Sequence, residues 1–209
     1  MLKDKRFTSL KELFNYLASK EGATVSYQRG ETIYKEGEPD NKVYWVDSGG
    51  IAQSQRISNG QNLTYQILLR NDIFSTYHLS SRVINQPCTA KALVNSTLKE
   101  LLRDTFKEYL LSNPELSLEV IDKISDELQA RDETLERQIS MTAKERIHSI
   151  LENLAPLGKK CGRGVSITFI TRRELAEMAG MTEETATRSL STLEGEGVLQ
   201  KSRGEILLF

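Results

Sequence analysis

Residues 171–198, TRRELAEMAGMTEETATRSLSTLEGEGV, decide the fold of the last third of this chain. Thr171 is followed three residues later by Glu174, a capping box that predicts the start of a helix. Gly180 stands where helices commonly end in a left-handed residue, because glycine has no Cβ to oppose that conformation. Thr182 then predicts the N-cap of a second helix. The stretch therefore predicts a helix, a tight turn and a second helix.

Each predicted helix carries an apolar face on which the pair can pack together. The inward positions are Leu175, Ala176 and Ala179 in the first helix and Thr185, Ala186, Leu190 and Leu193 in the second. Three residues of the second helix then face outward: Glu184, Thr187 and Arg188. Two short helices joined by a glycine-containing turn are typical of the DNA-binding helix-turn-helix, whose second helix enters the major groove. An ordinary helical hairpin is the alternative interpretation.

The residues that follow predict a β-hairpin, or wing. A strand begins at 197–199, residues 202–204 (Ser-Arg-Gly) form a turn, and residues 205–209 return. Lys201 and Arg203 lie near the predicted tip, where cations contact phosphates. An ordinary helical hairpin does not explain this wing, so the DNA-binding interpretation is favoured.

Composition sets limits on this interpretation. The chain has 209 residues, enough for one large or two small domains, and 38% of them are hydrophobic. Its net charge is −1, and residues 141–209 hold ten Lys/Arg against nine Asp/Glu. Bulk charge therefore gives no electrostatic case for nucleic acid, and the prediction depends on the motif and on charge placement.

Several classes of protein are excluded on composition. No apolar run approaches the roughly 18 residues of a membrane span, and residues 1–14 lack a signal-peptide core. Cys88 and Cys161 are far apart, so no iron–sulfur cluster or structural zinc is expected. We expect a reduced, cytoplasmic location, no membrane and no bound metal.

The first half of the chain has a different period. Residues 8–20 predict a short amphipathic helix, and short β-type runs separated by glycines then continue to about residue 102. The runs are residues 24–28, 32–36, 42–46, 51–57, 63–69, 88–94 and 96–102. Many short strands at this spacing predict a closed β unit, a barrel or jelly-roll. Such a unit can enclose a ligand or simply a packed interior.

A long helix follows. Pro114 predicts its first position, and it continues to about residue 140, roughly 40 Å at 1.5 Å per residue. Four residues form an apolar heptad seam: Ile121, Ile124, Leu128 and Leu135. A second copy of the chain is the simplest partner for this seam, and packing on the chain's own β unit is the alternative.

One seam position is polar. Arg131 stands where an apolar residue is expected, with Asp132 and Arg137 close by. Salt bridges between two chains are one explanation. The other is that Arg131 reaches the β unit and binds an anionic ligand.

The predicted fold is α+β. It comprises a β-roll of the jelly-roll type with an amino-terminal helix (1–104), a dimerisation helix (105–140) and a winged helix-turn-helix (141–209). Within the last part, residues 141–155 predict a helix, 156–164 a flexible basic loop and 165–170 a strand.

With this order of elements, the chain resembles the Crp/Fnr superfamily of bacterial transcription regulators over about residues 23–209. The similar stretches are RGETIYKEGEPDNKVYWVDSGGIA (29–52), SNPELSLEVIDKISDEL (112–128) and ITRRELAEMAGMTEETATRSLSTLEGEGVL (170–199). The resemblance implies a homodimer that reads an inverted repeat of TGA-type half-sites in double-stranded DNA. It implies Glu184, Thr187 and Arg188 as base readers. It implies contacts to phosphates from Thr171, Arg172, Arg173, Thr182, Ser189 and Lys201.

The chain departs from the family's cyclic-AMP binders. They carry Gly-Glu and later Arg-Ser in the segment that corresponds to NDIFSTYHLSSRVINQPCTAKA (71–92). Here Asn71-Asp72 and Phe74-Ser75 replace the glycine-bearing segment, and Gln86-Pro87 or Pro87-Cys88 stands where the resemblance implies Arg-Ser, so cyclic AMP is not expected. The cysteine cluster of the oxygen-sensing branch is absent, and the lone His78 does not predict haem. An anion such as an organic acid is one hypothesis, with a pocket of Phe74, Ser75, Arg82, Arg131 and Asp132. No effector at all is the other.

The leading hypothesis is therefore a DNA-binding activator, with the loop at 158–164 near RNA polymerase. Repression uses the same surface and stays open. A signalling module with a vestigial helix-turn-helix is a second alternative. An enzyme is not expected, because no phosphate loop or nucleophile motif is present and His78 and His148 lie in different predicted domains.

Overall fold

The computed structural model describes residues 6–20, 23–58 and 60–209. The first five residues, part of the segment predicted to lack a signal-peptide core, lie outside the described residues, as do 21–22 and 59. The chain divides into two compact units, one of residues 1–53 and 67–130 and one of residues 54–66 and 131–209. This division cuts the long helix and assigns the outer half of one hairpin to the second unit, unlike the division predicted from sequence.

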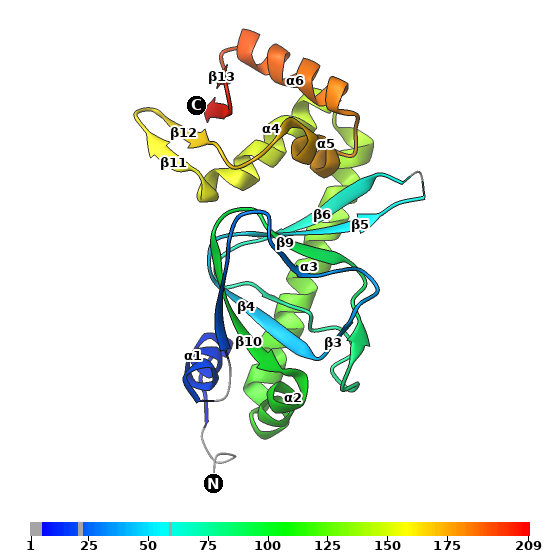
Figure 1. Cartoon of the computed structure of the whole chain (residues 1–209), viewed down its shortest axis with the longest axis vertical. Helices are drawn as coiled ribbons and strands as arrows, with labels where there is room; N and C mark the ends of the chain where they lie inside the picture. The colour runs from blue at the N-terminus through cyan, green and yellow to red at the C-terminus, as the bar shows by residue number, and fades with distance from the viewer. Residues whose placement is uncertain (1–5, 21–22, 59) are drawn as a thin grey trace. The chain divides into compact units, whose positions relative to one another are not determined.

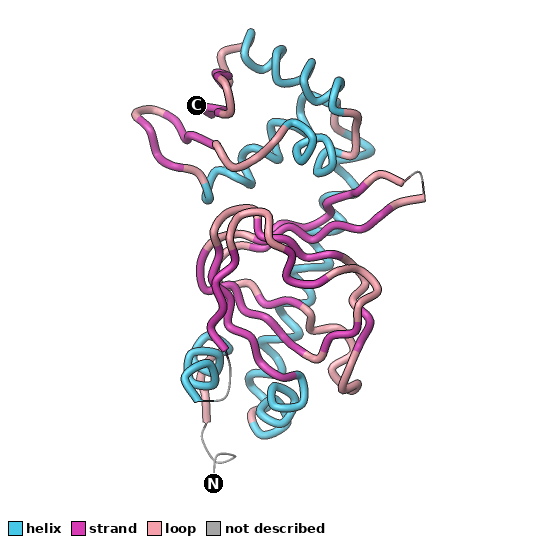
Figure 2. Tube along the Cα trace, viewed as in Figure 1, coloured by secondary structure: helices cyan, strands magenta, loops and turns pink. Residues whose placement is uncertain are grey.

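The β-roll consists of short strands, as predicted (Figure 1, Figure 2). The bounds are β1 Ala23–Tyr27, β2 Thr32–Tyr34, β3 Pro39–Asp40, β4 Lys42–Ser48, β5 Ile51–Arg56, β6 Asn62–Leu68, β7 Ile73–Phe74, β8 Ile84–Asn85, β9 Thr89–Ala92 and β10 Ser96–Leu102. They form two four-stranded sheets, of order β1-β10-β4-β7 and β2-β9-β5-β6, and the pair β3-β8. Strand β4 pairs antiparallel with β10, which brings Tyr44 opposite Glu100.

The amphipathic helix at the amino terminus, α1 (Leu10–Lys20), is confirmed. Its apolar face is fully buried in one core cluster with β4, β10 and the next helix, α2 (Arg103–Ser112). Phe14 stacks on Trp45 with ring centroids 5.4 Å apart and also contacts Phe106. The helix therefore closes one side of the roll's core, because its apolar stripe is buried against the side chains of β4, β10 and α2.

The long helix α3 runs from Pro114 to Ser140 and begins at proline, as predicted. Leu116 and Val120 are buried, whereas the four seam residues, with Leu118 and Ile139 beyond them, are all exposed. The most exposed is Ile139, at 87%. A row of exposed apolar residues along one helix leaves a surface that a partner helix can cover.

The second unit contains the remaining elements. They are α4 Ala143–Leu154, the 3-10 turn η1 Ala155–Leu157, β11 Lys159–Cys161, β12 Gly164–Ile167, α5 Arg172–Ala179, α6 Glu183–Gly195, β13 Leu199–Ser202 and β14 Glu205–Leu208. The strands form one sheet of order β11-β12-β14-β13. Ile147, Leu151 and Leu154 of α4 are fully buried, and Ile150 is half-buried. Across the described residues, no helix is both long and apolar enough to span a membrane.

The prediction of a flexible loop at 156–164 is wrong. Residues 159–167 form the β11–β12 hairpin, with Gly162 at φ +55° in its turn. Strand β12 then pairs antiparallel with β14 of the wing. The segment is basic and rich in glycine, so local sequence indicates a loop, but its backbone pairs as β11 with the adjacent β12, which the distant strand β14 anchors in the sheet.

Candidate nucleic-acid interface

The helix-turn-helix begins and ends where the sequence predicts. The Thr171 hydroxyl accepts from the Glu174 N–H at 3.1 Å, and the Glu174 carboxylate accepts from the Thr171 N–H at 2.8 Å. Gly180 ends α5 in the left-handed conformation, at φ +61°. Thr182 caps α6 by accepting from the Thr185 N–H at 3.2 Å. Local hydrogen bonds thus fix both helix starts.

Helix α6 separates the candidate base readers from the core. Ala186, Leu190 and Leu193 are buried. On the opposite side, Glu184 and Arg188 keep 80% and 72% of their side-chain surface exposed. They form an ion pair of 3.7 Å across one helical turn, and Thr187 is half-buried between them. The first two turns of α6 therefore offer a carboxylate and a guanidinium side by side.

The candidate phosphate contacts do not all lie at the surface. Thr171, Arg172, Arg173 and Thr182 are exposed, and Arg173 pairs with Glu177 at 3.2 Å. Ser189 is only 6% exposed, on the inward side of α6. Since its hydroxyl is not presented with the others, we leave Ser189 out of the interface. Lys201 keeps 21% of its side-chain surface exposed and pairs with Glu194 of α6 at 3.1 Å.

The five residues predicted as an effector pocket do not gather in either unit. Phe74 and Ser75 are buried in the roll, and Phe74 stacks on Tyr44 with centroids 4.9 Å apart. Arg82 is exposed and pairs with Asp104 at 3.5 Å. Arg131 and Asp132 belong to the second unit, where the Arg131 guanidinium lies 4.9 Å from the centre of the Tyr65 ring.

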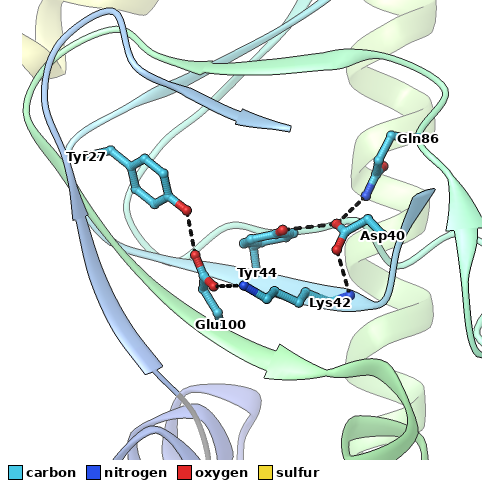
Figure 3. Close-up of polar contacts among 6 residues, drawn as sticks. All are labelled: Tyr27, Asp40, Lys42, Tyr44, Gln86 and Glu100. Carbon is cyan, nitrogen blue, oxygen red and sulfur yellow. Dashed lines mark hydrogen bonds and ion pairs between the residues drawn. The ribbon is translucent and has the colours of Figure 1, made fainter. Parts of the chain in front are cut away.

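The roll's polar groups instead bind one another. Gln86, in one of the two pairs that the sequence offers for the Arg-Ser position of cyclic-AMP binders, is 1% exposed. Its amide donates to the Asp40 carboxylate at 2.7 Å and to the Ser75 hydroxyl at 2.6 Å. Asp40 also accepts from the Tyr44 hydroxyl at 3.0 Å (Figure 3). The amide nitrogen of Gln86 is thus occupied by protein partners, whereas its Oε1 is buried without a hydrogen-bond partner among the described residues.

A second chain of contacts lies beside this one (Figure 3). The Glu100 carboxylate accepts from the Tyr27 hydroxyl at 2.6 Å and from the Lys42 ammonium at 2.5 Å. Burial, followed by the hydrogen bond to Glu100, raises the pKa of Tyr27. Burial also raises the pKa of Tyr44, with Asp40 adding to the effect. Both phenols therefore act as hydrogen-bond donors at physiological pH.

Sequence reasoning missed Arg103, which is fully buried at the start of α2. Its guanidinium donates to the carbonyls of Ser75 at 2.8 Å, Tyr77 at 2.7 Å and Lys42 at 3.2 Å, and to the Ser75 hydroxyl at 3.2 Å. Burial lowers its pKa, which Asp40 partly offsets. Arg103 holds Ser75 at φ +62°, a conformation that serine rarely adopts. The signal available in the sequence was the position of Arg103, which directly follows the predicted strand at residues 96–102.

No group of three or more His, Cys, Asp or Glu side chains suited to a metal ion occurs in residues 6–20, 23–58 and 60–209.

Comparison with known proteins agrees with this geometry. Residues 24–113 match a cyclic nucleotide-binding domain, and residues 145–208 match a Crp-like helix-turn-helix domain. The CRP-like cAMP-activated global transcriptional regulator of Mycobacterium tuberculosis is 23% identical over 88% of this chain and 83% of its own length. The global nitrogen regulator of a Nostoc species is 27% identical, over 80% of this chain and 77% of its own length.

Solved structures show the same fold. The structure of FixK2 from Bradyrhizobium japonicum superposes with a TM-score of 0.75 at 23% identity, covering 90% of this chain and 92% of that one. A Thermus thermophilus regulator of the CRP family gives a TM-score of 0.77 at 20% identity, covering 88% and 91%. The β-roll, long helix and carboxyl-terminal helix-turn-helix are therefore shared across these proteins.

Proposed function

This chain belongs to the Crp/Fnr family of transcription regulators, and from that premise we propose that it binds DNA as a homodimer and reads an inverted repeat of TGA-type half-sites. The observation that carries the proposal is the exposed pair Glu184 and Arg188 on α6. A carboxylate accepts from the amino group of cytosine, and a guanidinium donates two bonds to guanine. Thr187, between them, is suited to a thymine methyl or a base edge.

The candidate phosphate contacts also support the placement of α6 in the DNA groove. Thr171, Arg172, Arg173 and Thr182 are exposed around the amino-terminal ends of α5 and α6. Helix N-termini favour anions, because their free N–H groups and the helix dipole both attract negative charge. Glu183, beside Glu184, opposes this attraction, so we expect moderate affinity for non-specific DNA.

The dimer is supported by the exposed seam of α3. Ile121, Leu128 and Leu135 each keep more than half of their surface exposed. A homodimer would cover this row on both copies at once, and its two-fold symmetry matches that of an inverted repeat. The two recognition helices would then read half-sites about 34 Å apart.

We further propose that the protein works in the cytoplasm without cyclic AMP. Gln86 is engaged with Asp40 and Ser75, and residues 84–92 contain no arginine, so a cyclic phosphate would not meet the guanidinium that it needs. An effector of another kind, or none, is consistent with this roll. The name of the Mycobacterium tuberculosis relative states activation by cAMP, and we do not extend that property to this chain.

Activation is favoured over repression by the β11–β12 hairpin. Lys159 and Lys160 of β11 and Arg163 of the following turn are all exposed on an ordered hairpin. An ordered cluster of three cations fits an acidic surface of RNA polymerase, and a rigid cluster costs little entropy on docking. Substitution of the three by alanine should abolish activated transcription while leaving DNA affinity unchanged.

The test of DNA readout is fluorescence anisotropy at stated salt, with a TGTGA-type palindrome, a TTGAT-type palindrome and scrambled DNA. We expect selective binding to one palindrome and a loss of roughly 10- to 100-fold on Arg188→Ala. Arg82→Ala, which removes an arginine of the roll that is even more exposed and is likewise paired with a carboxylate, is the matched control and should bind as the wild type does. Equal affinity for all three DNAs, unchanged by Arg188→Ala, would refute the proposal.

A further inference from the structure

The wing is joined to the recognition helix through Lys201. The Lys201 N–H donates to one oxygen of the Glu194 carboxylate at 2.8 Å, and the Lys201 ammonium lies 3.1 Å from the other oxygen. The same ammonium donates to the Ser191 hydroxyl at 2.8 Å. Glu194 and Ser191 both belong to α6, whereas Lys201 belongs to β13. The side chain that sequence assigns to DNA phosphate thus points back at the recognition helix.

We infer that Lys201 and Glu194 form a tether that positions the wing on the recognition helix, and that Arg203 is the cation by which the wing contacts phosphate. The inference rests on the proposed DNA-binding function. It assigns the two wing cations different roles: Lys201 is a positioning residue, and Arg203 is an interface residue.

Lys201 and Arg203 differ in whether their charge is already paired within the protein. Lys201 is paired with a carboxylate of the same domain and keeps only 21% of its side-chain surface exposed, against 76% for the paired Arg173, so it presents little net charge toward DNA. To reach a phosphate, the ammonium would leave two acceptors and expose the Glu194 carboxylate beside the DNA backbone, where like charges repel. Arg203 is exposed at the turn between β13 and β14, so it carries a positive charge outward without such a cost.

The turn that presents Arg203 is held from a second direction. Glu205 accepts from the Ser166 hydroxyl of β12 at 2.5 Å and from the Ser202 hydroxyl at 3.2 Å. Gly204 supplies the left-handed residue of the turn, at φ +78°. The wing is therefore fixed to α6 by Lys201 and to β12 by Glu205. A turn fixed on both sides loses little freedom when its arginine binds.

The experiment uses the dependence of DNA affinity on salt, because each lost phosphate contact lowers the slope of log K against log [salt] by about 0.9. The decisive variant is the double substitution Glu194→Gln with Lys201→Met, which removes both charges and leaves the net charge unchanged. We expect its affinity for the preferred palindrome to fall roughly threefold to tenfold with an unchanged slope. Arg203→Ala should lower the slope by about 0.9 per protomer, equally on specific and scrambled DNA.

The matched control is Lys144→Met with Glu196→Gln, which removes a 2.7 Å ion pair elsewhere in the same unit. It should change neither affinity nor slope. Circular dichroism and thermal unfolding of every variant establish that the domain is folded. A double variant at 194 and 201 whose slope falls by about 0.9, or an Arg203→Ala protein whose slope is unchanged, would overturn the inference. Wild-type protein without sequence preference would instead refute the proposed function, so the two failures are distinguishable.

Discussion

The β-roll and the recognition helix contain the same kinds of polar side chain and use them in opposite ways. In the roll, Arg103 and Gln86 are at most 1% exposed, and their hydrogen bonds end on protein carbonyls, a hydroxyl and a carboxylate. On α6, Glu184 and Arg188 are paired but remain mostly exposed. The difference teaches that burial, not residue type, separates groups that hold a fold from groups that recognise a ligand, because a buried side chain is out of reach of an external partner.

The largest effect should come from Arg103→Met. The substitution removes four hydrogen bonds and leaves carbonyls without donors inside the roll. We expect the free energy of unfolding to fall by about 3–5 kcal/mol, measured by urea denaturation. Arg82→Ala breaks an exposed ion pair and should cost no more than about 1 kcal/mol. Similar losses from the two variants would break the contrast between buried and exposed arginine.

Leu128→Glu should have the next largest effect, on assembly rather than on folding. Leu128 is 58% exposed in the single chain, and a dimer would bury it. Two unpaired carboxylates, one from each copy, should raise the dimer dissociation constant by about a hundredfold in analytical ultracentrifugation. Leu111→Glu places the same charge at a position of α2 that is 74% exposed, outside the seam, and should leave the dimer intact. Equal behaviour of both variants would count against the seam.

Two matched capping boxes separate stability from recognition. Thr171→Ala and Thr142→Ala each remove a hydroxyl that caps a helix of the second unit. Each should lower the free energy of unfolding by about 1 kcal/mol. Only Thr171→Ala should also weaken DNA binding, because Thr171 is a proposed phosphate contact whereas Thr142 is not. Anisotropy and denaturation on both proteins check this, and equal losses of DNA affinity would contradict the assignment.

The smallest effects are those of pH, and the two regions should differ in sign. Hydrogen bonds from the N–H and ammonium of Lys201 lower the pKa of Glu194. The ionised carboxylate therefore stabilises the fold above its unfolded pKa of about 4.3, and this contribution is lost as pH falls through the lower folded pKa. Burial raises the pKa of Asp72 in the roll, so its ionised form costs stability above about pH 4, and acid removes that cost.

Urea denaturation between pH 3 and pH 7 measures the contributions of Glu194 and Asp72 to the free energy of unfolding. The stability advantage of wild type over Glu194→Gln should shrink toward pH 3. The comparison with Asp72→Asn should change in the opposite direction, with wild type gaining relative to the variant as pH falls. Parallel trends for the two substitutions would contradict the contrast.

The winged helix was predictable because its signals are local. A capping box joins two residues only three positions apart, and Gly180 ends α5 by its own backbone conformation. The inward position of Ser189 was also readable, since it precedes Leu190 and lies three residues after Ala186 on the same face. The family resemblance, rather than the helical pattern, had suggested it as a phosphate contact.

The roll's interior was not predictable, because its polar partners are distant in sequence. Gln86 binds Asp40 across 46 residues, and Tyr27 binds Glu100 across 73. No local pattern distinguishes a glutamine that meets an aspartate from one that faces a ligand. The partners of Lys201 were hidden for a similar reason: its charge indicated phosphate, but the fold places Glu194 and Ser191 within reach of its ammonium.

The central claim is that this chain reads DNA sequence through the exposed pair on α6, and selection from a random DNA pool tests it most directly. Wild-type protein, Arg188→Ala and Arg82→Ala would be taken through the same rounds, and the retained DNA would be sequenced. The account predicts that wild type and Arg82→Ala enrich one inverted repeat with TGA-type half-sites, and that Arg188→Ala loses the preference at the guanine. No enrichment by the wild-type protein, or the same enriched repeat with Arg188→Ala, would contradict the account.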